Sequence, residues 1–383
     1  MNPTSSQYPP RQTPQGAPFL PGETSADSSP TPTGAATPAT SSRPAVAPVA
    51  SRAHRPTRAT TAATAGQKVP RRSQPRRTLQ LSDSLLDYTL HLQPRDRVLT
   101  MLLDEHRTLT TTQIAAVLYD AYATAERRLY RLRQAGWLDR FTAVRATGHR
   151  DIHWVLGPLG AHWAAGEEHR PLPSARAGRD ERRTIAASSH LDHHDGARQV
   201  FIDLLVHARH HPGARLARWW SPARAAAAAG QRIHPDGHGV WEQHDPATGR
   251  LIQVGFYLEY DTGSETLSVL RNKLEPYRRL RQEGPDYPLL LFLPNPTREA
   301  NLHRKLNGEA PHLGITLATT TAATTTSHPD HLAGPVWKIA GNGRHRHRLA
   351  DLPSQHGKAS TPYHPGPPTP EQDPLHRLGP LTG

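Results

Sequence analysis

Residues 79–166 carry a hydrophobic pattern that changes from a helical period to the short apolar runs of strands. Apolar side chains recur at helical spacing in three segments between residues 95 and 135. Two short apolar segments, 137–141 and 152–156, follow and are joined by a polar, basic turn. Three helices followed by a hairpin is the order of a winged helix-turn-helix, so the pattern predicts this fold and contact with duplex DNA.

The third predicted helix, residues 122–135, has two different faces. Ala125, Leu129 and Leu132 form its apolar side. In a winged helix this element enters the major groove, while the hairpin lies on the DNA backbone. Two alternatives stay open: a basic helix face is often only solvated, and winged helices also bind proteins. The residues predicted to contact DNA are Thr124, Arg127, Arg128, Tyr130, Arg131, Arg133 and Gln134 of the helix and Arg150 of the hairpin.

A second patterned region, 185–352, contains both the helical period and the alternating pattern of strands. We expect a helix from Asp195, short strands at 232–236 and 240–243, and a buried strand at 287–293. The strand 251–261 alternates, with Ile252, Val254, Phe256, Leu258 and Tyr260 on one face and Tyr257, Glu259 and Asp261 on the other. The spacing Thr262-x-x-Glu265 predicts a capping box, and the helix after it carries an apolar stripe of Leu267, Leu270, Leu274, Tyr277 and Leu280, with a kink at Pro276. The fold class is therefore mixed α/β.

Candidate chemistry gathers on this second region. Lys273 falls inside the apolar arc of its helix, where a lysine either covers core surface with its stem or pairs with a carboxylate; Asp236, Glu259 and Asp261 are the expected partners. Pro235-Asp236, a strand that ends in Glu259 and a nearby lysine resemble the PD-(D/E)xK nuclease fold. That resemblance implies Mg²⁺ held by Asp236 and Glu259, with Lys273 activating water; without cleavage, no cofactor is expected.

The pattern departs from that family at one position. The family places lysine two residues after the strand carboxylate, where this chain has Asp261. Lys273 would be a migrated substitute, and Lys273-x-x-x-Tyr277 resembles the Gln-x-x-x-Tyr helix motif of RecB-like nucleases. This departure supports the nuclease-like fold more than nuclease activity, because such a sheet can still bind DNA as a clamp after losing its catalytic lysine.

Composition sets the remaining boundaries. Residues 1–78 are rich in Pro, Ser, Thr and Ala and carry mostly arginine as charge, so we expect a disordered basic tail. The charged stretch 167–184 is expected to be a linker, and the Pro-, His- and Gly-rich stretch 353–383 a second disordered tail.

Charge and residue usage point to the class of partner. The net charge of +13 favours a polyanion, and the absence of cysteine excludes disulfides and thiolate sites. We expect a cytoplasmic protein with no membrane segment, because neither a signal peptide nor a long apolar run is present. The pairs His193-His194 and His345-x-His347 are interpreted as surface histidines, since neither has a further ligand at a recognised metal-site spacing.

Both regions together resemble the replication-relaxation family of actinobacterial plasmids and integrative elements. The resemblance implies a role in plasmid replication and DNA relaxation, with double-stranded DNA and plasmid replication or transfer proteins as partners. The matching stretches are 109–141, 194–205, 233–236, 256–265 continued to Lys273, 336–337 and 349–352.

Three hypotheses follow. The chain is a DNA-binding accessory protein of replication or relaxation, a metal-dependent nuclease or nickase centred on Asp236, Glu259, Asp261 and Lys273, or a non-catalytic regulator or partner-binding module. An assay for nicking of supercoiled plasmid distinguishes the nuclease from the accessory protein. The salt dependence of DNA affinity distinguishes both from a partner-binding module.

Overall fold

The computed structural model describes residues 85, 87–144, 148, 150–308, 313–357 and 361–378. The chain divides into two compact units, Met1–Gln74 and Pro75–Gly383, and every described residue belongs to the second. The predicted N-terminal tail, 1–78, lies outside the described residues. Among those that are described, no helix combines the length and apolar character needed to cross a membrane.

The first region is a helical cluster with a small sheet. Its helices are α2 (Pro94–His106), α3 (Thr111–Leu118) and α4 (Tyr122–Gln134). The strands β1 (Leu109–Thr110), β2 (Leu138–Val144) and β3 (Arg150–Leu156) form an antiparallel sheet in the order β1-β3-β2. Thr110 caps α3 with its side chain, and Gln113 completes the capping box.

Two tryptophans hold this region together. Trp137 and Trp154 are fully buried, and each indole N–H donates to a threonine hydroxyl, that of Thr100 for Trp137 and that of Thr111 for Trp154. Burial of such large rings stabilises a small domain, provided that the indole N–H finds a partner.

Two helices follow the hairpin. Helix α5 (Pro158–Glu167) packs against α2, and α6 (Ala175–Ala186) contacts β2. Helix α6 lies in the stretch that composition predicted to be a linker. Its start is fixed by the side chain of Ser174, which accepts the Ala177 N–H.

The second region is built on a mixed sheet of seven strands in the described residues, in the order β10-β9-β8-β7-β6-β5-β4. The predicted mixed α/β class is confirmed. Strands β6, β7 and β8 are mutually parallel, and the remaining pairs are antiparallel. The strands are β4 (Ala214–Trp220), β5 (Gly237–His244), β6 (Leu251–Tyr260), β7 (Leu289–Leu293), β8 (Leu317–Thr321), β9 (Trp337–Ile339) and β10 (Arg346–His347).

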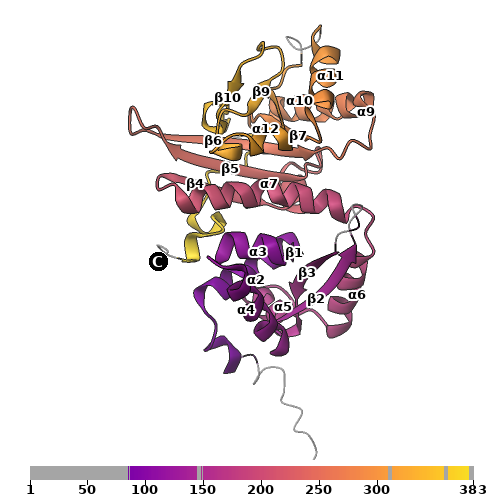
Figure 1. The fold of residues 1–383 in the computed structure, drawn as a ribbon, viewed down its shortest axis with the longest axis vertical. Helices are drawn as coiled ribbons and strands as arrows, with labels where there is room; N and C mark the ends of the chain where they lie inside the picture. The colour runs from indigo at the N-terminus through magenta and orange to yellow at the C-terminus, as the bar shows by residue number, and fades with distance from the viewer. Residues whose placement is uncertain are drawn as a thin grey trace, which may run out of the picture. The chain divides into compact units, whose positions relative to one another are not determined.

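Helices cover both faces of this sheet (Figure 1). The long helix α7 (Leu191–His210) packs on one face, where Phe256 and Leu258 of β6 join its apolar side. The opposite face carries Tyr257, which packs with residues of the helices there. The other helical elements are α8 (Pro222–Ala228), α9 (Leu267–Asn272), α10 (Leu274–Glu283), α11 (Pro296–Leu306), α12 (Ala322–Thr326) and the 3₁₀ turns η2 (His331–Ala333), η3 (Leu349–Asp351), η4 (Pro370–Gln372) and η5 (His376–Leu378).

Three details differ from the sequence predictions. Residues 232–236 form a loop that leads into β5 rather than a strand of their own. The helix after β6 is capped by Thr266 and not by Thr262. That helix is also interrupted at Lys273 rather than kinked at Pro276, because a proline ring clashes with the carbonyl four residues earlier, here that of Asn272.

Helix α7 also packs against the first region, on the side of α3 (Figure 1). The buried His153 of β3 places its Nε2 atom 2.7 Å from Asp195 Oδ2 of α7. The side-chain amide of Gln113 donates to the carbonyl oxygen of Asp195. The apolar core is continuous across this contact, since one cluster contains residues of both regions.

The C-terminal stretch differs from the predicted disordered tail in its described residues. Arg218 of β4 is completely buried, and its guanidinium donates to the carbonyl oxygens of Pro365, Gly366 and Pro367. The side chain of Gln372 accepts a further bond from Arg218 Nε. A buried guanidinium requires hydrogen-bond acceptors, and the described part of this stretch supplies them for Nε and Nη2 but not for Nη1.

Candidate functional site

Helix α4 presents a polar, basic stripe to solvent. Thr124, Arg127, Arg131 and Gln134 are exposed, and their spacing of three and four residues puts them on one face. Ala125, Leu129 and Leu132, on the other side, are fully buried. The packing of the apolar side therefore fixes the orientation of the stripe. We call these four exposed residues the α4 stripe.

Arg128 of the predicted DNA-binding set has an intramolecular partner. Its guanidinium forms an ion pair with the buried Asp96 of α2, where Arg128 Nε lies 3.0 Å from Oδ1. The hydrogen bond to Asp96 raises the pKa of Arg128. Arg128 thus joins α4 to α2.

The other members of that set lie around the β2–β3 hairpin. The hydroxyl of Tyr130 accepts a bond of 2.6 Å from Arg140 of β2. Arg133 is exposed and lies 3.9 Å from Asp139. Arg150 is exposed at the start of β3, while residues 145–147 and 149 of the turn lie outside the described residues.

A second group of polar side chains lies where β6 ends. Asp236, just before β5, accepts the Tyr260 N–H at 2.8 Å with Oδ2. Its Oδ1 atom lies 2.8 Å from Nε2 of His193, on the first turn of α7. The hydrogen bond with Asp236 raises the pKa of His193, although burial opposes the shift. Asp236 is therefore held from two sides.

Glu259 of β6 lies in the same group. Its Oε1 accepts a 2.6 Å bond from the hydroxyl of Tyr277 in α10, and its Oε2 lies 3.9 Å from Lys273 Nζ. Burial, reinforced by the negative charge of Asp236, raises the pKa of Glu259 to about 7. Lys273 is closer to Glu265, at 2.8 Å. We call Asp236, His193, Glu259, Lys273 and Tyr277 the carboxylate cluster.

Asp261 has a different partner from the cluster. Its carboxylate is buried and forms a two-pronged ion pair with the guanidinium of Arg298, on the first turn of α11. One of its oxygens also accepts the Gly263 N–H at 2.8 Å. The structure thus brings Asp236, Glu259 and Lys273 together and gives Asp261 to Arg298.

The donor set of the cluster suits a magnesium ion. Mg²⁺ is held in proteins by one or two carboxylates and keeps several waters. The pKa of Glu259 is raised first by burial and second by the negative charge of Asp236, and a divalent cation would offset both effects. Asp236 and Glu259 are the residues that would hold it.

Three functional neighbours were missed by sequence reasoning. The sequence predicts a helix from Asp195 with His193 ahead of it, whereas α7 begins at Leu191 and contains His193. The sequence predicts that Glu265 belongs to a capping box, whereas its carboxylate pairs with Lys273. Arg298 carries no sequence signal, because its partner is 37 positions away on another element.

The α4 stripe and the carboxylate cluster both lie in a part of the chain that matches a known family. Residues 100–289 match the model of the replication-relaxation family. This match supports the resemblance drawn from the sequence. No match is found among curated proteins or among solved structures.

Proposed function

From the replication-relaxation match over residues 100–289, we propose that this chain is a DNA-binding accessory protein of plasmid or mobile-element replication and DNA relaxation. It acts in the cytoplasm, where such DNA is copied, together with replication or transfer proteins of the same element. The observation that carries the proposal is the α4 stripe.

The shape of the first region supports docking on duplex DNA. We infer that α2, α3, α4 and the β2–β3 hairpin form a winged helix-turn-helix, with α4 as the recognition helix. Such a helix fits the major groove, which is ~12 Å wide. Arg127 and Arg131 would contact bases or phosphates, and Thr124 and Gln134 would add hydrogen bonds. Arg150, the first residue of β3 after the turn of the wing, would contact the backbone.

The test is fluorescence anisotropy of the full chain with a labelled duplex at several salt concentrations. A chain that neutralises several phosphates shows log K falling with log salt, at a slope of about −0.9 per phosphate. Arg127→Ala and Arg131→Ala should each weaken binding and flatten the slope by about one phosphate contact. Arg304→Ala is the matched control, because Arg304 is exposed on α11 and donates to Asn301 on the same helix.

The same titration tests the partner-binding alternative. Affinity that does not change with salt, or variants of the α4 stripe that bind as well as the control, would contradict DNA docking through α4. A regulator or partner-binding module would then be the better hypothesis.

A second candidate function, metal-dependent DNA cleavage, is favoured by the carboxylate cluster. Bound between Asp236 and Glu259, Mg²⁺ would supply a Lewis acid for the scissile phosphate. His193 orients the Asp236 carboxylate, and Tyr277 orients that of Glu259. Lys273 would then orient the attacking water.

Nicking of supercoiled plasmid in Mg²⁺ tests cleavage separately from binding. If the chain nicks, Glu259→Gln should abolish nicking and leave the anisotropy unchanged. Asp286→Asn, which changes a half-buried carboxylate paired with Arg281 outside the cluster, is the control. If the folded chain binds DNA but does not nick it, the nuclease hypothesis is excluded and the accessory role is retained.

A further inference from the structure

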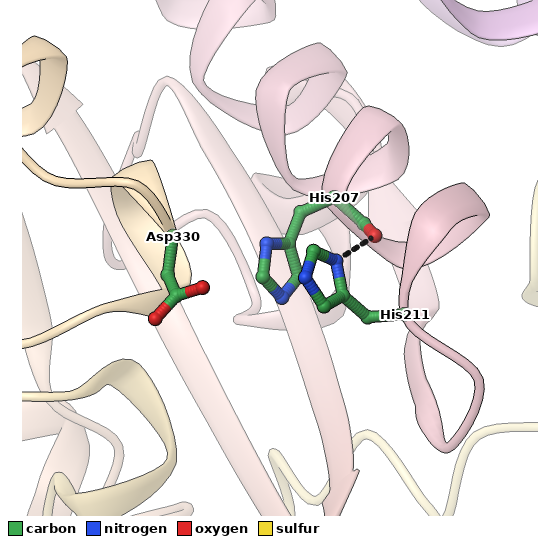
Figure 2. Close-up of side chains that lie close together, drawn as sticks. All are labelled: His207, His211 and Asp330. Carbon is green, nitrogen blue, oxygen red and sulfur yellow. Dashed lines mark hydrogen bonds between the residues drawn. The ribbon is translucent and has the colours of Figure 1, made fainter.

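Another group of possible ligands lies at the opposite end of α7 from the carboxylate cluster. His207 and His211 are one helical turn apart, and Asp330 approaches them from the segment before η2 (Figure 2). Among the described residues, these are the three whose ligand atoms lie within 4.8 Å of one another. His207 and Asp330 are half-buried and His211 is exposed, so an ion can enter from solvent.

A local hydrogen bond determines which ring nitrogen of His211 can bind an ion. His211 Nδ1 lies 2.9 Å from the carbonyl oxygen of His207. A carbonyl only accepts, so Nδ1 is the donor and Nε2 is the nitrogen left to bind an ion. Such an outer hydrogen bond fixes the tautomer and orientation of metal-binding histidines in proteins.

The second ring is held just as closely. The imidazoles of His207 and His211 are stacked with centroids 3.7 Å apart and planes 8° from parallel. Burial and the neighbouring His211 lower the pKa of His207 to about 4. Asp330 is placed by its own turn, where its N–H donates to His328 Nδ1.

The donor set decides the class of ion. Two imidazole nitrogens and one carboxylate oxygen suit Zn²⁺, Co²⁺ or Ni²⁺, whereas Mg²⁺ and Ca²⁺ prefer oxygen ligands. Around tetrahedral zinc at ~2.05 Å, ligand atoms lie ~3.3 Å apart. The side chains would therefore close by up to about 1.5 Å, and the two rings would turn out of their parallel stack so that their lone pairs converge on the ion.

We propose that His207, His211 and Asp330 bind one zinc-class transition-metal ion, with water in the remaining position. The ion would tie the last turn of α7 to the segment that leads into β9. His193 and His207 are 14 positions apart on a continuous helix, or about 21 Å along its axis. The site is therefore independent of the carboxylate cluster and of DNA docking.

The experiment is calorimetric titration of the full chain, purified without a histidine tag and stripped with chelator, with ZnCl₂. Visible absorption of bound Co²⁺ reports the coordination. Wild type should bind one ion more tightly than any other. His211→Ala and Asp330→Asn should each weaken this step by about tenfold or more, the least expected of a direct ligand.

His210→Ala is the matched control, because His210 is the exposed neighbour on the same turn and bonds to Val206 instead. It should leave the tight step unchanged. With 25 histidines in the chain, weak binding elsewhere is expected and must be separated from this step. Equal losses in His210→Ala and His211→Ala, no tight step in wild type, or Asp330→Asn binding as wild type while folded by circular dichroism would each overturn the proposal.

Discussion

His153 Nε2 of β3 and Asp195 Oδ2 of α7 lie 2.7 Å apart with both side chains fully buried. Arg198, one turn further along α7, donates to the other oxygen of Asp195 at 2.7 Å. Polar groups from the first region and from the sheet's covering helix thus share one desolvated network. Such a network is costly to break in part, because the remaining charge is left buried.

The first prediction is that Asp195→Asn destabilises the chain by about 3 kcal/mol. Asparagine keeps the shape but removes the charge that pairs with Arg198 and faces His153. Urea unfolding at pH 7 measures the loss. Asp180→Asn, an exposed acidic residue on α6, should change stability by less than about 0.5 kcal/mol. Equal stability of the two variants would show that the buried network contributes nothing.

The second prediction concerns Glu259 and pH. Its folded pKa of about 7 lies above the ordinary value of 4.5, so its contribution to stability is complete below pH 4.5 and is lost as the pH rises through 7. The loss amounts to about 3 kcal/mol, at ~1.4 kcal/mol per pKa unit. Glu259→Gln removes this dependence and still accepts the bond from Tyr277.

Urea unfolding of wild type and Glu259→Gln at pH 5 and pH 8, without divalent cations, measures that difference. The free energy of unfolding of the variant should increase relative to that of wild type as the pH rises. Parallel stability profiles for the two chains would contradict the raised pKa.

Much of this architecture was readable from the sequence, and the failures have physical causes. The third helix and strand β6 were predicted because one face of each is strictly apolar, as in Leu129 and Leu258. The start of α7 was misplaced because its N-cap, His190, makes no side-chain cap bond. Strand β4 was not predicted because Arg215 and Arg218 break its apolar pattern and a bulge lies between Leu216 and Arg218.

The candidate site was predictable only in its local parts. Glu259 and Lys273 were identified because alternation and helical phase place them on inward faces. The partners of Asp236 and Asp261, His193 and Arg298, come from elements 43 and 37 positions away. Periodicity describes the face of one element and contains no information on which side chain of another element meets it.

The third prediction is that Gly196→Ala destabilises the chain through a clash with Tyr260, which lies next to the carboxylate cluster. A Cβ at this position on α7 would lie 2.3 Å from a ring atom of Tyr260, whose N–H binds Asp236. We expect a loss of about 1–3 kcal/mol from overpacking, measured by thermal or urea unfolding. Gly178→Ala, on the exposed helix α6 with open space around it, should instead stabilise by about 0.5–1 kcal/mol. The same sign for both substitutions would count against the close contact.

The fourth prediction is that removal of residues 364–383 destabilises the chain by about 2–4 kcal/mol, because Arg218 loses its carbonyl and Gln372 acceptors. Urea unfolding of the truncated chain measures this. Arg218→Met in the truncated chain should recover part of the loss, since it removes the unpaired charge. If Arg218→Met makes the truncated chain less stable still, the C-terminal stretch is not the partner that Arg218 requires.

Helix α7 touches α3 and β3 near its start and holds His193 against Asp236 within the same turn. A 20-residue helix is a rigid rod of about 30 Å, so it fixes the carboxylate cluster relative to the α4 stripe. In the proposed complex with duplex DNA, the cluster would then face one side of the double helix, at a constant number of base pairs from the bases in contact with α4. Half a turn of DNA inserted between these positions would present the opposite face of the duplex to it.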